Sequence, residues 1–552
     1  MYLNFLLNID EIYLFFILLL FSFTIINSSL KNKYNVNFKA SLFTTYFAII
    51  LNLIYSLVTF YIIYNIVLSS NLLTNFNVEK QDIYNILITY NQEYMTDLII
   101  KGILSISVFI WFIIYYVSIK NKYTKKENTT FEPVILYLLT TYLLLKLITS
   151  QDMFLLITTL ESQNLALCII CAYSVLDKGV SKIEAALKLY ITSAASSGFL
   201  LLGSSLIYGV TGSINFNEIS LQLKSRAFEQ VLFLLENIIY NFKNTNNIEN
   251  LNTYYSTIAV SEKTTVILFT IGILCFFISI AFKIGQVPFH LWMADVYNGG
   301  NIIFVSYLAI FPKIAIGYFF IKSVIFYFSF NFILLKLLFF SGFLTIIIGI
   351  LGALYQKKIK SFIAYSSIAN LGYLILLSST ANLINNNLLI TISILFIINY
   401  AIVLLQIFIS LISNFYLINA NKKNQLKEVI YLNELAGYWK INKINSLFLI
   451  ISFLTLIGIP PLVGFLIKFY IVTFLVANNL ILVSWCFLIL GVISTFYYLK
   501  VIKILIMDNV NKNLFLINGA IKSKIIQISI ALLQCILFVK PLLFVLIYII
   551  LF

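Results

Sequence analysis

Five charged side chains lie inside long apolar segments of this sequence, where an ionised group is costly. They are Glu161, Lys188, Lys283, Lys313 and Lys468. A charge at mid-bilayer costs at least about 2.5–3.5 kcal/mol, so such residues are functional candidates by default. Burial in low-dielectric surroundings lowers the pKa of a lysine, and a nearby carboxylate raises it again. A row of these groups, connected by water, can therefore relay protons.

The alternative for any single lysine is that its amine snorkels to the membrane surface. Lys336 and Lys540 fit this alternative, because no helix break or carboxylate lies near them in the sequence. Lys146 fits it less well. The five charges as a set do not fit it, since two of them stand beside helix breaks.

Both breaks consist of glycine and proline within a long apolar run, one after Lys283 and one before Lys468. Broken helices are tolerated in a membrane only where the freed backbone groups meet protein or water. Two such breaks about five spans apart are typical of inverted repeats with a site at their interface. The residues concerned are Gly285 and Pro288 in the first break, and Gly458, Pro460 and Pro461 in the second.

Two further polar residues follow the first break. The only histidine, His290, can titrate near neutral pH and could connect the row of charges to the inner side of the membrane. The alternative is a hydrogen-bonded structural histidine. For Asp295 the sequence favours capping or packing at the inner end of the segment.

The elements that position these residues are membrane helices. Hydrophobic residues make up 61% of the 552 residues and charged ones only 10%, which indicates an all-α polytopic membrane protein. The net charge of +15 comes from lysines in loops between spans, which argues against nucleic-acid binding. Fourteen spans are predicted at about 11–29, 40–69, 98–119, 134–150, 152–174, 185–209, 264–294, 301–322, 330–354, 361–379, 386–417, 446–473, 478–506 and 525–551.

Lysines gather in the odd-numbered loops, which the positive-inside rule places on the inner side. Both termini then face the outer side. The long sixth loop, 210–263, combines a helical stretch with an Asn-rich run and is expected to be an insert.

One membrane domain, 1–552, with two inverted five-helix repeats follows from this pattern. Its parts are three N-terminal helices in 1–131, a first repeat in 132–322 with its break in span seven, a second repeat in 330–507 with its break in span twelve, and a last helix in 525–552.

Several of these segments resemble the family of chain 2 of respiratory complex I, the proton-pumping NADH:ubiquinone oxidoreductase. FKIGQVPFHLWMADVY resembles the family's span-seven pattern F-K-x-x-x-x-P-F-H-x-W-x-P-D-V-Y, and LESQNLAL resembles its span-five E-L-Q-S-L-A-L. EAALKLYITSAASSGFLLLG, QKKIKSFIAYSSIANLGYL and GIPPLVGFLIKFY are similar to its spans six, ten and twelve. Departures are Ala294 in place of a proline, Asn370 in place of a frequent histidine, and DVYNGGNI in place of D-V-Y-E-G-A-P-T.

The resemblance implies roles for the charged row. Glu161 would be the span-five glutamate, Lys283 the central lysine, Lys313 the connecting lysine and Lys468 the distal lysine, with Lys188 a further family lysine. The chain would bind no redox cofactor or metal itself, since FMN, iron–sulfur clusters and ubiquinone belong to other subunits of the whole enzyme. Expected partners are the antiporter-like chain 4, the small chain 4L, accessory subunits and membrane lipids.

The resemblance and the AT-rich coding bias, with one arginine among 36 basic residues, imply a mitochondrially encoded inner-membrane protein, with a bacterial plasma membrane as the less favoured location. Two other functions stay open from the sequence: a cation/proton antiporter outside the respiratory chain, and a structural spacer of the membrane arm that moves no protons.

Overall fold

The computed structural model describes most of the chain. It covers residues 2–29, 35–73, 81–122, 132–173, 180–223, 251–381, 386–413, 416–418, 425–427, 430–460, 462–477, 479–509, 514–516 and 527–528. The predicted insert 210–263 is therefore described only at its two ends. Pro461, Lys540 and almost all of the predicted last span lie outside the described residues.

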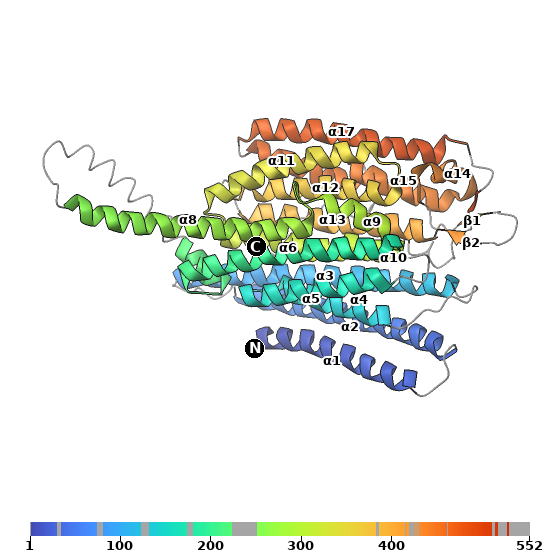
Figure 1. Ribbon diagram of the computed structural model, residues 1–552, viewed down its shortest axis with the longest axis horizontal. Helices are drawn as coiled ribbons and strands as arrows, with labels where there is room; N and C mark the ends of the chain where they lie inside the picture. The colour runs from blue at the N-terminus through green and yellow to red at the C-terminus, as the bar shows by residue number, and fades with distance from the viewer. Residues whose placement is uncertain are drawn as a thin grey trace.

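The helices lie side by side with their long axes roughly parallel, from α1 at one edge to α17 at the other (Figure 1). The first half of the chain forms α1 (Tyr2–Ser29), α2 (Asn35–Leu73), α3 (Gln81–Lys122), α4 (Glu132–Ile148), α5 (Met153–Tyr173) and α6 (Val180–Thr211). The second half begins with α8 (Leu251–Ile284), which extends beyond the other helices in Figure 1.

The remaining elements follow in chain order. They are α9 (Leu291–Gly299), α10 (Ile302–Lys322), a π-helical turn η2 (Ser323–Tyr327), α11 (Phe332–Tyr355), α12 (Ile359–Ser378), α13 (Asn386–Ser413), a 3-10 turn η3 (Leu432–Leu435), α14 (Tyr438–Ile441), α15 (Lys443–Ile457), α16 (Val463–Ala477) and α17 (Ile481–Ile506).

Ten helices in the described part of the chain are long and apolar enough to cross a membrane. The two helices on either side of the second break, α15 and α16, are apolar but have only 15 residues each. This confirms a polytopic helical membrane protein. The count of fourteen spans stays a prediction, because the region 525–551 is almost entirely outside the described residues.

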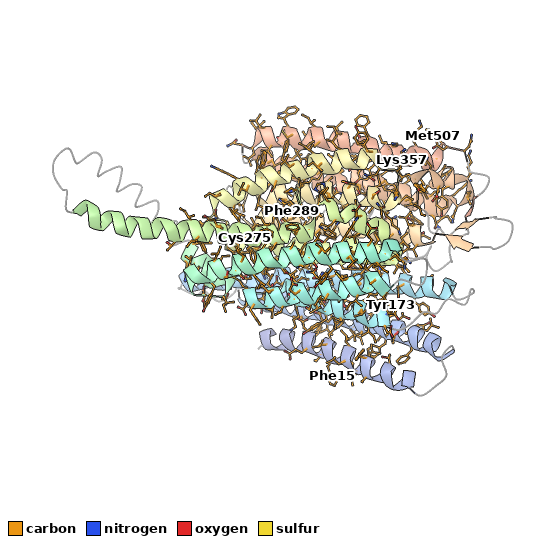
Figure 2. The ribbon with its side chains drawn as sticks, in the orientation of Figure 1. Phe15, Tyr173, Cys275, Phe289, Lys357 and Met507 are labelled. Carbon is orange, nitrogen blue, oxygen red and sulfur yellow. The ribbon has the colours of Figure 1, made fainter. Side chains whose placement is uncertain are left out.

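The centre of the bundle is formed by α10 and α12, whose residues are nearly all buried. A helix that is apolar all round packs among other helices rather than at a surface. The outer helices instead expose large apolar side chains, such as Phe15 on α1, which is 59% exposed and projects from the edge of the bundle (Figure 2). Such side chains are suited to face lipid or a neighbouring subunit.

A small antiparallel sheet at one end of the bundle was not predicted. Its strands β1 (Tyr416–Ile418), β2 (Gln425–Lys427) and β3 (Leu514–Leu516) are paired in the order β2–β1–β3. Tyr416 pairs with both Lys427 and Leu516, so the sheet joins the loop after α13 to the segment after α17. The all-α fold class is confirmed for the membrane helices, and these three short strands lie in the segments between and after them.

A row of buried charges at two broken helices

The first break is confirmed between α8 and α9. Helix α8 ends at Ile284, and Gly285 has the left-handed φ of 81° that a glycine adopts at low cost. The backbone amides of Gly285 and Gln286 both donate to the carbonyl of Ala281, at 2.9 Å. A cis peptide precedes Pro288, and the chain resumes as α9 at Leu291. This is the glycine-terminated helix end that satisfies carbonyls without continuing the helix.

Side chains satisfy the polar groups that the break leaves free. The indole of Trp292 donates to the carbonyl of Phe282 at 3.0 Å, and the amide of Gln286 donates to the hydroxyl of Ser341 at 2.5 Å. Phe289, labelled in Figure 2, lies in the connection itself and is half-buried. The break therefore meets protein on one side, while Pro288 and Leu291 are exposed.

Lys283 lies two residues before Gly285 in the break. Its side chain is 4% exposed, and within the described part of the chain its ammonium has no hydrogen-bond partner. The nearest opposite charge is the Glu161 carboxylate on α5, at 3.7 Å from the Lys283 nitrogen. Glu161 is 38% exposed, so the pair joins a buried cation to a carboxylate at the edge of the bundle.

Lys188 on α6 has different partners. Its ammonium donates to the Asp295 carboxylate at 2.8 Å and lies 2.9 Å from the Glu184 carboxylate. All three side chains are at least 40% exposed. Asp295 therefore forms an ion pair between α9 and α6 instead of the cap or packing contact that the sequence favoured.

His290 is the residue before α9 and is buried, with 8% of its surface exposed. Its side chain does not cap the helix, and Nδ1 has no hydrogen-bond partner among the described residues. The ring lies edge-on to Tyr365 with 6.4 Å between centroids. The ring also has a hydrogen-bond contact with the backbone of Pro288, so the alternative of a hydrogen-bonded structural histidine stays open.

Lys313 lies in the middle of the central helix α10, directly after Pro312. Its ammonium donates to the hydroxyl of Ser367 on α12 at 2.6 Å and contacts the sulfur of Met293 on α9 at 3.5 Å. The ring of Tyr297 lies 5.5 Å away. Within the described residues Lys313 has no carboxylate partner, so its charge is balanced only by dipoles and an aromatic face.

The second break repeats the geometry of the first. Helix α15 ends at Ile457, and Gly458 has a φ of 84°. The amides of Gly458 and Ile459 both point to the carbonyl of Leu454, at 3.0 and 3.4 Å. Pro460 follows on the exposed side, and α16 begins at Val463.

Lys468 on α16 turns back toward this break. Its ammonium donates to the carbonyls of Leu456 at 3.0 Å and Ile457 at 2.9 Å. The last carbonyls of a helix have no partner inside the helix and carry partial negative charge. Lys468 is therefore held by backbone carbonyl oxygens at the end of the broken helix, whereas Lys283 is paired with the carboxylate of Glu161.

In the described part of the chain no hydrogen bond or ion pair joins Lys283 to Lys313, or Lys313 to Lys468. Buried tyrosine hydroxyls lie near Ser367, the residue that binds Lys313. The hydroxyls of Tyr297 and Tyr400 approach Ser367 without good hydrogen-bond geometry. The buried hydroxyl of Tyr498 on α17 likewise lacks a well-formed hydrogen bond among the described residues. Buried polar groups in this condition are typical sites of internal water.

Four buried charges were missed from the sequence. Lys101 on α3 forms an ion pair with Asp10 on α1 at 2.7 Å, and Lys322 at the end of α10 forms one with Asp97 on α3 at 2.7 Å. Lys146 on α4 lies 3.7 Å from the same Asp10. The predicted spans began one residue after each of these aspartates, which hid both pairs. Lys336 is exposed, in agreement with the snorkelling alternative.

Comparison with known proteins places this geometry in a family. The model of the family "NADH:quinone oxidoreductase/Mrp antiporter, TM" matches residues 150–236 and 227–496, a region that contains every residue of the charged row. The NADH-ubiquinone oxidoreductase chain 2 of Marchantia polymorpha is 32% identical over 391 residues, which cover 70% of this chain and 69% of the relative. The NADH-quinone oxidoreductase subunit N of Bartonella bacilliformis is 30% identical over 401 residues, covering 71% and 72%.

Solved structures share the fold at lower identity. A chain of respiratory complex I from Thermus thermophilus has a TM-score of 0.58 at 19% identity, covering 83% of this chain and 96% of that one. A chain of the Mrp complex from Dietzia sp. DQ12-45-1b has a TM-score of 0.62 at 15% identity, covering 81% and 82%. The helical architecture is therefore common to respiratory and antiporter complexes, while the relatives matched by sequence carry the chain 2 and subunit N names. The chain belongs to the NADH:quinone oxidoreductase/Mrp antiporter transmembrane family, and within it to the group of complex I chain 2 and subunit N.

Proposed function

We propose that this chain is the antiporter-like chain 2 subunit of the membrane arm of respiratory complex I, and that it translocates protons through Glu161, Lys283, Lys313 and Lys468. The observation that carries the proposal is the Glu161–Lys283 pair at a broken helix. A buried ammonium without a hydrogen bond, 3.7 Å from a partly exposed carboxylate, is held weakly enough for its proton occupancy to change.

The pair works as a switch in this proposal. When Glu161 lies close, its negative charge stabilises the protonated amine of Lys283. When the carboxylate moves away or binds another cation, the buried charge loses that stabilisation and the proton is released. Because the helix ends at Gly285, its last turn can shift without breaking a continuous hydrogen-bond ladder.

Transfer beyond Lys283 needs water or hydroxyl groups. Ser367 already bonds Lys313, and the unsatisfied hydroxyls of Tyr297 and Tyr400 lie beside it. Helices α13 and α17, which carry Tyr400 and Tyr498, both pack against α16, the helix of Lys468. Internal water among these hydroxyls would complete a path from Lys313 to Lys468.

We assign the two ends of this path from the distribution of charged residues. His290 would connect the row to the inner side, and the lysine-rich odd loops would face that side, leaving both termini outside. Lys188, held by two carboxylates, would set the charge near α9 and be a weaker relay candidate. The similar breaks at Gly285 and Gly458 support two inverted repeats at 132–322 and 330–507.

The setting of the chain follows from the same proposal. We place it in the mitochondrial inner membrane, beside the antiporter-like chain 4, the small chain 4L and accessory subunits. FMN, iron–sulfur clusters and ubiquinone would be bound by other subunits of the enzyme. The chain would thus belong to an H⁺-translocating NADH:ubiquinone reductase without doing redox chemistry.

Gentle purification of the native assembly, with mass spectrometry of its subunits and an NADH oxidation assay, tests this assignment. We expect a large assembly that oxidises NADH with quinone. A small assembly without flavin would instead favour a cation/proton antiporter, to which the Mrp likeness of the fold already points. A complex in which neutral variants of the charged row pump normally would favour a structural spacer.

A further inference from the structure

The central helix α10 is held by α3 through an ion pair that lies deep in the protein. The ammonium of Lys322 donates to both carboxylate oxygens of Asp97, at 2.7 and 3.0 Å. The side chains are 0% and 4% exposed. An ion pair this buried is costly to form unless its geometry is good and its remaining polar atoms are satisfied.

Neighbouring side chains satisfy them. The hydroxyl of Tyr318, one turn before Lys322, approaches Asp97 at 2.6 Å and Thr96 at 2.7 Å. Just beyond, Tyr327 in the π-helical turn η2 reaches Glu93 at 3.5 Å. One face of α3 therefore contacts the end of α10, where the chain changes from the α-helical geometry of α10 to the π-helical geometry of η2. Turns of π-helix are often found at functional sites.

Lys313 lies on the other side of the same helix. Nine residues separate it from Lys322, which corresponds to about 13.5 Å of rise and roughly half a turn in azimuth. Lys313 accordingly faces Ser367 of α12 and Met293 of α9, while Lys322 faces α3. A rotation or shift of α10 that breaks the Asp97 contact must also move the Lys313 ammonium relative to Ser367.

We propose that Asp97 and Lys322 are positioning residues for Lys313: their ion pair sets the rotation and axial register of α10, and so the contact of Lys313 with Ser367. This inference rests on the proposed proton-relay function of Lys313. Asp97 accepts three hydrogen bonds from protein donors, in contrast to the single ion pair at 3.7 Å between Glu161 and Lys283. A fixed contact of this kind suits an anchor, and a loose one suits proton exchange.

The chain offers a matched control in the Asp10–Lys101 pair. It is also buried, has the same 2.7 Å separation, and includes a tyrosine donor, since the Tyr55 hydroxyl donates to Asp10 at 2.6 Å. It joins α1 to α3, and among the described residues none of its hydrogen bonds or ion pairs reaches α10. Removing either pair costs the bundle a buried interhelical contact, but only one of them holds the helix of Lys313.

The test compares two double variants in the assembled complex, reconstituted in vesicles with NADH as electron donor. They are Asp97→Asn with Lys322→Met, and Asp10→Asn with Lys101→Met. The second also takes from Lys146 the carboxylate that lies 3.7 Å from its ammonium, so it is the harsher of the two changes and makes the comparison stringent. We expect the first to pump protons about 2- to 30-fold more slowly than the second per assembled complex, the range expected for coupling through packed networks. Adding Ser367→Ala to the first should cause no further loss, because residues in one network are non-additive.

Equal pumping rates in the two double variants would overturn the proposal. It would also be overturned if adding Ser367→Ala to Asp97→Asn/Lys322→Met lowered the pumping rate by the same factor as Ser367→Ala does alone. If that double variant does not assemble, Tyr318→Phe removes only a hydroxyl from Asp97 and should give a smaller loss with the same non-additivity. Lys313→Met in the same host separates the two levels of inference. Unchanged pumping by that variant would reject the proposed function of Lys313 itself, whatever the ion pair does.

Discussion

Replacing Glu161 with glutamine removes the charge nearest Lys283 while keeping the size of the side chain. Two unit charges 3.7 Å apart interact by about 4 kcal/mol at an effective dielectric constant near 20. Because Glu161 is 38% exposed, water screens the pair, and we take about 1–2 kcal/mol as the stabilisation of the protonated amine. Loss of this stabilisation lowers the ratio of protonated to neutral Lys283 by roughly 5- to 30-fold.

We expect proton translocation by the assembled Glu161→Gln complex to fall by up to the same factor. The assay is proton uptake into vesicles driven by NADH oxidation, normalised to the amount of assembled complex. Glu132→Gln is the matched control, because Glu132 opens the neighbouring helix α4 and accepts a hydrogen bond from Tyr173 instead of pairing with a lysine. Wild-type pumping by Glu161→Gln would refute the switch at this pair.

The two breaks allow further tests. Gly285→Ala places a side chain at a φ of 81° and against the Met293 methyl, so we expect about 1–3 kcal/mol of destabilisation, seen as less assembled complex on native gels. Gly491→Ala in α17, where no atom lies within 4 Å of the added carbon, should be neutral or stabilising; an equal loss of assembly would show that the strain argument is wrong. Lys468→Met leaves the carbonyls of Leu456 and Ile457 without their donor and should lower both thermal stability, by about 1–3 kcal/mol, and pumping. The exposed Lys336→Met is its control, and the idea fails if both variants behave alike.

The broken helices were predictable because glycine and proline act locally. Gly285 and Gly458 end their helices through a backbone conformation that few other residues adopt, and a proline in the next few positions prevents the helix from continuing. Lys283 and Lys468 were predicted to be functional residues because burying an ionised side chain within an apolar membrane span costs free energy. Their burial in the structure agrees with that reasoning for Lys283, and Lys468 is partly buried.

The partners of these charges were not predictable, because they come from other helices or from the backbone. Nothing in the order of residues says that Lys468 bonds the end of α15, or that Asp295 pairs with Lys188 from more than 100 positions away. Asp97 escaped notice for a different reason. Hydropathy places the start of a span where the apolar run begins, yet α3 is helical from Gln81 and carries Asp97 into the buried bundle.

The most direct test of proton relay by the charged row is the pumping activity of a purified complex that carries Lys283→Met. Methionine fills a similar volume and removes the buried cation that pairs with Glu161. We expect the complex to assemble and to contain its redox centres, but to translocate fewer protons than wild type. An assembled Lys283→Met complex that pumps protons at the wild-type rate would contradict a relay through this lysine.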